Sequence, residues 1–124
     1  MFNASDLSNF FGTNEYHFQP MFKSIDYTDG IKFLNNNGAN WLVVKALALI
    51  QCGNLMAKHD YFLCIKCILE KKDDKLTGSA LFMIENGEEE AVLTEKIDYT
   101  DLPCNITMFC EMGEKPVLML ASEH

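Results

Sequence analysis

The sequence predicts an α+β domain in which three N-terminal helices pack on one face of a roughly five-stranded antiparallel sheet. Hydrophobic residues recur with a helical period over residues 1–55, and they alternate with a period of two in the β-meander expected over residues 59–122. Helices followed by consecutive strands are typical of α+β domains. No linker divides the 124 residues, so we expect one globular domain over residues 1–124.

The first two helices are predicted from the signals at their ends. Asn3 or Ser5 can cap a short helix that continues to Phe11. Thr28 is placed to cap a second helix, and the Asn-Asn-Asn-Gly segment at residues 35–38 supplies its stop.

The third helix is predicted to be the most deeply buried. Asn40 can cap it, and residues 41–50 are apolar except for Lys45. A helix that is apolar around nearly its whole circumference belongs in a core. The run is about half the length needed to cross a bilayer, so we expect no membrane span.

Alternation of apolar and polar residues predicts the strands. In residues 61–69 the odd positions are all apolar, which indicates a strand with one fully buried face. A charged turn at residues 71–75 and a type I′ hairpin at Asn86-Gly87 would connect the strands that follow. The expected strands cover residues 61–69, 80–84, 91–99, 104–111 and 117–121.

Composition and net charge disfavour some classes of binding partner. The chain is 48% hydrophobic and 23% charged, as in a globular domain, and its net charge is −8. Such a charge repels nucleic acids and anionic membranes at long range, so we expect neither as a direct partner. All ten basic residues are lysines, which disfavours a site built on a bidentate arginine clamp.

Most of the negative charge lies in one predicted hairpin. Residues 85–101 contain seven acidic residues and one lysine, a net charge of −6. Acidic residues at a turn commonly keep a sheet edge soluble. Alternatively, the hairpin imitates a nucleic-acid backbone and binds a basic groove of another protein. The candidate partner-binding residues are Glu85, Glu88, Glu89, Glu90 and Glu95.

The cysteines indicate a reducing compartment and no metal centre. Their number is odd, and the first residues lack a basic and an apolar stretch, so we expect a cytoplasmic protein with free thiols. Cys64 and Cys67 are three apart, but on a strand they point to opposite faces and cannot bind one ion. We expect no metal, no cofactor and no catalytic residue. The five cysteines are Cys52, Cys64, Cys67, Cys104 and Cys110.

A repeated pentapeptide is the other feature of interest. Residues 25–29 and residues 97–101 both read Ile-Asp-Tyr-Thr-Asp. In one interpretation, the threonine and aspartate cap the following turn and the tyrosine anchors the strand end in the core. In the other, the two copies meet and form a polar pocket for a cation or a polar ligand. The pocket residues would be Tyr27, Asp29, Tyr99 and Asp101.

Several segments together resemble a known family. They include Asp6-Leu7-Ser8-Asn9-Phe10, Gly12-Thr13, Tyr16-His17, the segment YTDGIKFL at 27–34, GANWL at 38–42, IDYTDLP at 97–103 and residues 118–123. The chain resembles, over nearly its whole length, the small bacterial proteins catalogued as domain of unknown function 6876. The resemblance implies no activity, but members resemble products of phages, plasmids and other mobile elements. It therefore implies a host-directed or anti-defence role, such as an anti-CRISPR protein.

These observations lead to one main functional hypothesis and two alternatives. The main hypothesis is a non-catalytic protein-binding or inhibitor module that contacts another protein, one with a basic surface, through the hairpin at residues 85–101. The first alternative is a small-ligand or divalent-metal-dependent enzyme centred on the repeated pentapeptide. The second is a structural subunit of a homo-oligomer.

Overall fold

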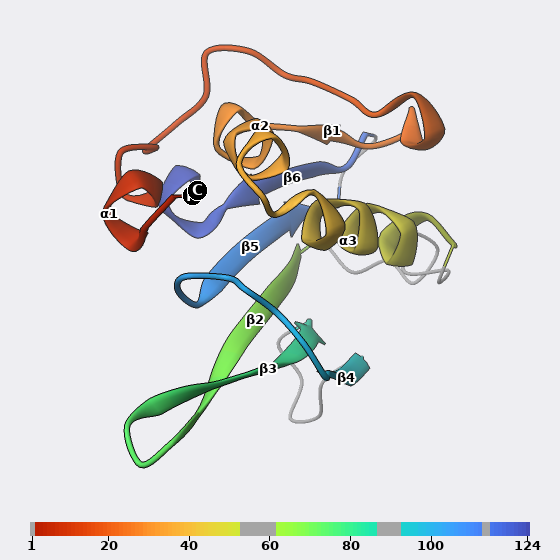
Figure 1. The fold of residues 1–124 in the computed structure, drawn as a ribbon. Helices are drawn as coiled ribbons and strands as arrows, with labels where there is room; N and C mark the ends of the chain where they lie inside the picture. Colours follow the sequence, from red (N-terminus) through yellow and green to blue (C-terminus); the bar gives the residue numbers. More distant parts are fainter. Residues whose placement is uncertain (1, 53–61, 87–92, 113–114) are drawn as a thin grey trace.

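The computed structural model describes residues 2–52, 62–86, 93–112 and 115–124, and it has an α+β fold (Figure 1). Short helical elements and two helices come first, and strands follow. The helical elements are α1 (Ala4–Leu7), η1 (Pro20–Phe22), α2 (Asp29–Asn36), α3 (Asn40–Cys52) and η3 (Ala121–Glu123). The strands are β1 (Asp26–Tyr27), β2 (Phe62–Lys72), β3 (Lys75–Glu85), β4 (Leu93–Ile97), β5 (Ile106–Glu111) and β6 (Val117–Leu120).

The sheet is mixed and has six strands in the order β1-β6-β5-β2-β3-β4. β1 pairs in parallel with β6, and the other pairs are antiparallel. The prediction of a roughly five-stranded antiparallel meander is therefore matched only in part, because the sheet has a sixth, parallel strand and its strands do not all follow one another in sequence order. β1 was missed because a strand of two residues has no alternation to detect, and β5 pairs with β2 instead of following β4.

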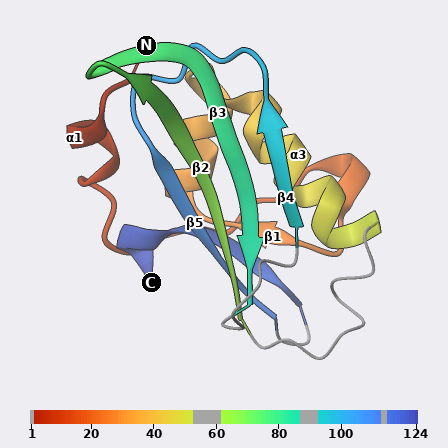
Figure 2. The same cartoon turned by 90° about the horizontal axis from the view of Figure 1, so that it is seen from below.

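The core lies between the sheet and the helices on one of its faces. Figure 2 views the sheet from its other side, with α2 and α3 behind it. The alternation predicted for residues 61–69 is confirmed over residues 62–67, where Leu63, Ile65 and Cys67 are fully buried; Leu69 is half-buried, and residue 61 lies outside the described residues. In α3, no residue from position 41 to 50 is exposed, and its buried side packs against this sheet face.

The observed helix ends match those predicted from the sequence only in part. Asn3 caps α1 through a capping box with Asp6, as predicted, but α1 ends at Leu7 and does not reach Phe11. Gly38 follows the end of α2 with φ 98°, a conformation that suits glycine. Asn40 is the first residue of α3, not its cap. None of the described helices could cross a membrane, and the longest, α3, has 13 residues.

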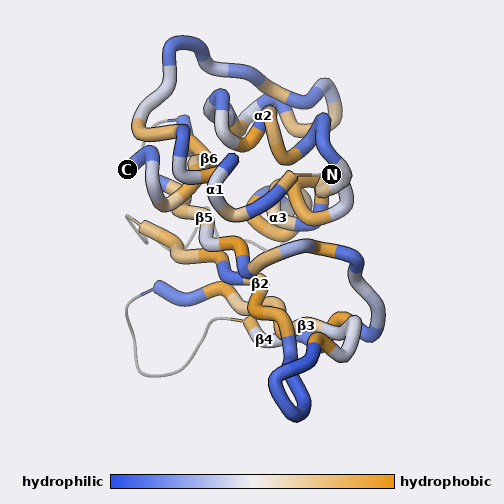
Figure 3. Tube along the Cα trace, turned by 60° about the vertical axis from the view of Figure 1, so that its left-hand side comes forward, coloured by the Kyte–Doolittle hydropathy of each residue, from blue (hydrophilic) through white to orange (hydrophobic). Residues whose placement is uncertain are grey.

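β2 and β3 form a long hairpin whose tip is the most hydrophilic part of the described chain in Figure 3. Each strand has 11 residues, and Lys72 pairs with Lys75 across the turn. Asp73 and Asp74 adopt φ values of 53° and 64°, as a type I′ turn requires. The turn itself therefore contains only Asp73 and Asp74, whereas the prediction placed it over residues 71–75. The Asn86-Gly87 hairpin lies partly outside the described residues.

We predict that this turn tolerates glycine but not a β-branched residue. Asp74→Val should lower the free energy of unfolding by about 1–2 kcal/mol, because a branched side chain is strained at positive φ. Asp74→Gly should leave the stability within about 0.5 kcal/mol of wild type. Urea unfolding would measure both, and equal stabilities for the two variants would contradict the prediction.

Candidate binding surface around Asp29

The first pentapeptide leads from β1 directly into α2. The Thr28 backbone N–H donates to the Leu118 carbonyl at 3.1 Å, which continues the pairing of β1 with β6. Thr28 occupies the N-cap position of α2, as predicted, but its side chain makes no capping hydrogen bond to the helix. The Thr28 hydroxyl donates instead to Glu123 Oε1 at 2.6 Å.

The Glu123 carboxylate takes over the capping role. Its Oε1 also accepts the Leu120 backbone N–H at 3.0 Å, and its Oε2 accepts the Gly30 N–H at 3.2 Å. An anion at a helix N-terminus is stabilised by the unpaired N–H groups and the helix dipole. Gly30 makes this approach possible, since a Cβ there would overlap Glu123 Oε1 and the Leu120 side chain.

Asp29 ties the N-terminal segment to the start of α2. Its Oδ1 lies 2.9 Å from His17 Nε2, and its Oδ2 accepts the Asn14 backbone N–H at 3.0 Å. The Asp29 N–H donates to Thr13 Oγ1 at 2.9 Å. The hydrogen bond from His17, followed by that from Asn14, holds the pKa of the Asp29 carboxyl below its usual range. Asp29 is therefore a carboxylate at neutral pH.

His17 fixes which side chains of the N-terminal segment face outward. It exchanges both backbone hydrogen bonds with Tyr27 at 2.8 Å, and their rings lie 5.7 Å apart. Successive side chains of an extended segment point to opposite sides. Tyr16 and Phe18 therefore point away from Asp29, and they are 64% and 54% exposed.

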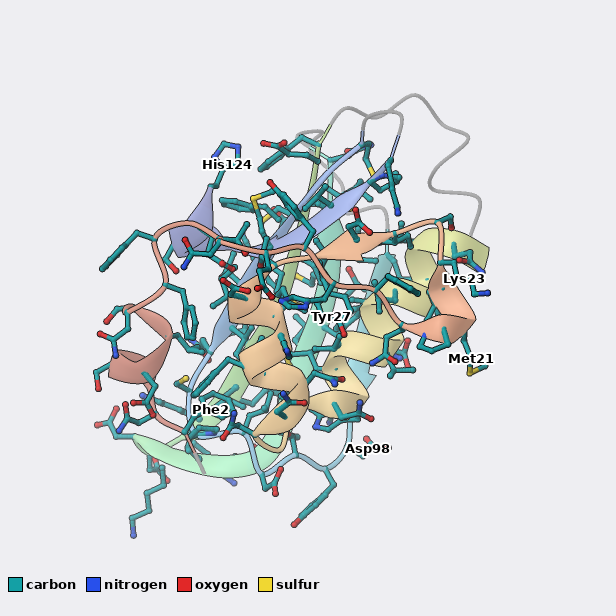
Figure 4. The ribbon with its side chains drawn as sticks, turned by 90° about the horizontal axis from the view of Figure 1, so that it is seen from above. Phe2, Met21, Lys23, Tyr27, Asp98 and His124 are labelled. Atoms are coloured by element: carbon teal, nitrogen blue, oxygen red, sulfur yellow. The ribbon has the colours of Figure 1, made fainter. Side chains whose placement is uncertain are left out.

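Two further large apolar side chains of this segment are exposed. Phe11 and Met21 are each 81% exposed, and Figure 4 shows Met21 projecting from the rim of the molecule. We call Phe11, Tyr16, Phe18 and Met21 the aromatic segment. A hollow of about 520 Å³ lies at its beginning, and among the described residues that line it Asp29 is the charged one; the others are Asn9, Phe10, Phe11, Gly12, Thr13 and Asn14.

The repeated pentapeptides do not form a shared pocket. The first copy contains β1, at one edge of the sheet, and the second begins at the end of β4, at the other edge. The Thr100 N–H donates to the carbonyl of Gly78 on β3. At about 4.8 Å per strand, roughly 24 Å separates the two edges. Tyr27 and Asp29 therefore lie far from the strand that leads to Tyr99 and Asp101.

The two copies also differ in what their residues do. Tyr27 is buried and anchors its strand, and burial raises the pKa of its hydroxyl, but Tyr99 is 80% exposed. The Thr100 hydroxyl accepts the Leu102 N–H at 3.1 Å, which is the predicted turn cap. The capping interpretation thus holds for the second threonine, and the anchoring interpretation for the first tyrosine.

Two of the five acidic residues predicted to bind a partner are paired within the chain. Glu85 lies 3.3 Å from Lys66 Nζ, and Glu95 lies 3.0 Å from Lys45 Nζ. Glu88, Glu89 and Glu90 lie outside the described residues. The structure therefore places Glu85 and Glu95 in ion pairs that reduce the charge they can offer to a partner.

The described cysteines contribute to packing and are not placed for chemistry. As predicted, Cys64 and Cys67 occupy opposite sheet faces, and Cys67 is fully buried. Burial raises the pKa of Cys67 to about 11 and that of Cys110 to about 12, so both remain protonated and unreactive. Within the described ranges, no group of three His, Cys, Asp or Glu residues is placed to hold a metal ion.

Sequence reasoning missed most of the residues that organise this surface. Thr13, Asn14 and His17 contact Asp29 across 12 to 16 positions, and Glu123 reaches Thr28 across 95. The one local signal was the Asp-Gly pair at the start of α2. A glycine at the second position of a helix, two residues after the N-cap threonine, indicates a close approach by another group.

We predict that Glu123 stabilises the fold through its negative charge. Glu123→Gln should lower the free energy of unfolding by about 1–2 kcal/mol, because an amide replaces one of the two acceptor oxygens at the α2 N-terminus. Gly30→Ala should have a similar or larger effect. Glu15→Gln, at an exposed position, serves as the control. Chemical denaturation would contradict the prediction if the Glu123 and Glu15 variants were equally stable.

We also predict a pH dependence for Asp29. A carboxyl whose pKa is lowered by folding adds stability above its unfolded pKa, near 3.8, and loses it as the pH falls through the lower folded value. Asp29→Asn should therefore be less stable than wild type at neutral pH, and the difference should shrink below the unfolded pKa. Asp101→Asn is the control. Urea unfolding over a pH series would refute the prediction if the difference stayed constant.

Comparison with known proteins identifies the family. No curated protein and no solved structure matches the chain. Residues 1–124, the whole chain, match the family described as "Family of unknown function (DUF6876)", in agreement with the resemblance noted from the sequence. The chain therefore belongs to this family of unknown function.

Proposed function

We propose that the protein is a non-catalytic binding module that acts by occupying a surface of another protein, and that the aromatic segment is its main contact. The supporting observation is that four large apolar side chains within residues 11–21 are more than half exposed. Aromatic residues and methionine are enriched where protein interfaces bury most of their energy. Exposed apolar residues that are scattered singly need no explanation, but Tyr16 and Phe18 lie on the same side of the extended segment and form an exposed aromatic pair.

The segment is held in place before any partner binds. Its centre is fixed by the two hydrogen bonds between His17 and Tyr27 and by the contact of His17 with Asp29. A preformed surface loses less conformational entropy on binding, so more of the contact energy appears as affinity.

The backbone of this segment also suits an extended partner. Because His17 directs both of its backbone hydrogen bonds toward β1, the backbone groups of Tyr16 and Phe18 point outward. An extended peptide can pair with such an edge and place its side chains beside the two aromatic rings. We therefore favour a partner that offers an extended strand with apolar side chains.

The acidic hairpin is the weaker candidate for the main contact, since Glu85 and Glu95 are paired with lysines. The role of Glu88, Glu89 and Glu90 toward a basic partner remains a prediction. So do the mobile-element origin and the anti-defence role, which rest on the family resemblance, and the cytoplasmic location. The enzyme alternative loses its shared pocket, because the two pentapeptides lie at opposite sheet edges.

We predict that the aromatic segment determines partner binding. The immobilised protein would be used to capture partners from a lysate of its source organism. Tyr16→Ser combined with Phe18→Ser should lower the yield of a captured protein at least tenfold, and circular dichroism should show an unchanged fold. Tyr99→Ser, which removes a still more exposed tyrosine at the other sheet edge, should leave the yield unchanged.

A second comparison separates the two candidate surfaces. If Glu88, Glu89 and Glu90 are changed together to glutamine and capture falls while the Tyr16 and Phe18 variant binds normally, the contact lies on the acidic hairpin. Loss of capture in both variants would assign a role to each surface. If neither variant affects a specifically captured protein, the proposed contact surface is wrong.

A further inference from the structure

The sheet has a second face that carries an apolar surface. Among the parts of the chain that the structure describes, no helix covers this face, which is turned toward the viewer in Figure 2. Its side chains are the alternate residues of the strands, and the pairing register places them in adjacent rows. We call this set the open sheet face: Phe62, Cys64, Lys66, Ile68, Leu81, Met83, Glu85, Thr94, Lys96, Thr107, Phe109, Glu111, Val117 and Met119.

An antiparallel sheet covered on one side normally presents polar residues on the other. Here the central positions are mostly apolar instead. Phe109 pairs with Met119 on one side and with Cys64 on the other. The rings of Phe62 and Phe109 lie 4.8 Å apart, and both contact the His124 ring. An apolar patch of this kind indicates an interaction surface.

The charges on this face cancel. Lys66 lies near its centre, 3.3 Å from Glu85, and both side chains are 34% exposed. Lys96 and Glu111 lie toward the margins, so these central rows are locally neutral on a chain whose net charge is −8, and Glu70, which accepts a hydrogen bond from Ser79, adds a negative charge nearer the β2–β3 turn. Two copies that repel each other elsewhere can therefore approach at this face.

We propose that the open sheet face is the interface of a symmetric homodimer, in which two copies stack their sheets about a two-fold axis near Lys66 and Glu85. In such an interface each contact occurs twice. Lys66 of each copy faces Glu85 of the other, so the two ion pairs are complementary across the axis. Phe62, Phe109 and Met83 surround these pairs with apolar contacts.

The size of the face agrees with this arrangement. With strands about 4.8 Å apart and a rise of about 3.3 Å per residue, the rows of the open sheet face, without the β2–β3 tip, occupy roughly 430 Å² in projection. Stable interfaces begin at about 600 Å² per partner. The face therefore suits a weak dimer that forms at high protein concentration. This inference does not depend on the aromatic segment, which lies beyond β1 at the sheet edge.

Sedimentation velocity over a wide concentration range tests the dimer. The wild type should sediment as a dimer at high concentration and dissociate on dilution. Met83→Glu should weaken dimerisation at least tenfold, because it places an unpaired charge in the apolar face. Leu76→Glu, at an exposed position near the β2–β3 turn, is the matched control and should dimerise normally. A wild type that is monomeric at every concentration overturns the proposal.

A charge exchange distinguishes contacts between copies from the ion pair within each copy. Lys66→Glu places two negative charges at the centre of the face, and Glu85→Lys places two positive charges there. Each variant alone should therefore be monomeric. Their mixture should form a heterodimer, detected by native mass spectrometry. This result would hold even if Met83→Glu failed to fold. A mixture that stays monomeric, while the wild type dimerises, would place the interface elsewhere.

Discussion

The carboxylate of Glu123 is the interaction on which the arrangement of the N-terminal third depends. It accepts hydrogen bonds from Thr28, Gly30 and Leu120, so one side chain joins the start of α2 to the end of β6. The same helix start carries Asp29, which holds His17 and the loop before it. The position of the exposed aromatic rings thus follows from a contact made by a residue near the other end of the chain.

The fold separates two kinds of surface. α2 and α3 cover one sheet face and complete the core, and the N-terminal segment extends that side past β1. The surface of the other face is formed by rows of apolar side chains and by the ion pair between Lys66 and Glu85. Because the two surfaces lie on different parts of the sheet, a second copy and an unrelated partner could be bound at the same time.

Much of the fold could be predicted from the sequence, and the reason is local periodicity. The alternation in residues 61–69 gave the buried face of β2 correctly, and the capping signal at Asn3 and the glycine at position 38 gave two helix ends. The parallel strand β1 could not be found, since its two residues are defined only by their pairing with Val117 and Leu118. The site was harder still, because the partners of Asp29 and Thr28 are distant in sequence.

The pairing of β1 with β6 also bears on the order in which the chain acquires its structure during synthesis. β2 and β3 are joined by a two-residue turn, so this hairpin can form as soon as residue 85 is available. β1 has no neighbour on its β6 side until residues 117–118 have been made, and α2 lacks its capping anion until residue 123. Contacts of such long range form slowly. The surface near the N-terminus is therefore among the last parts of the protein to become functional.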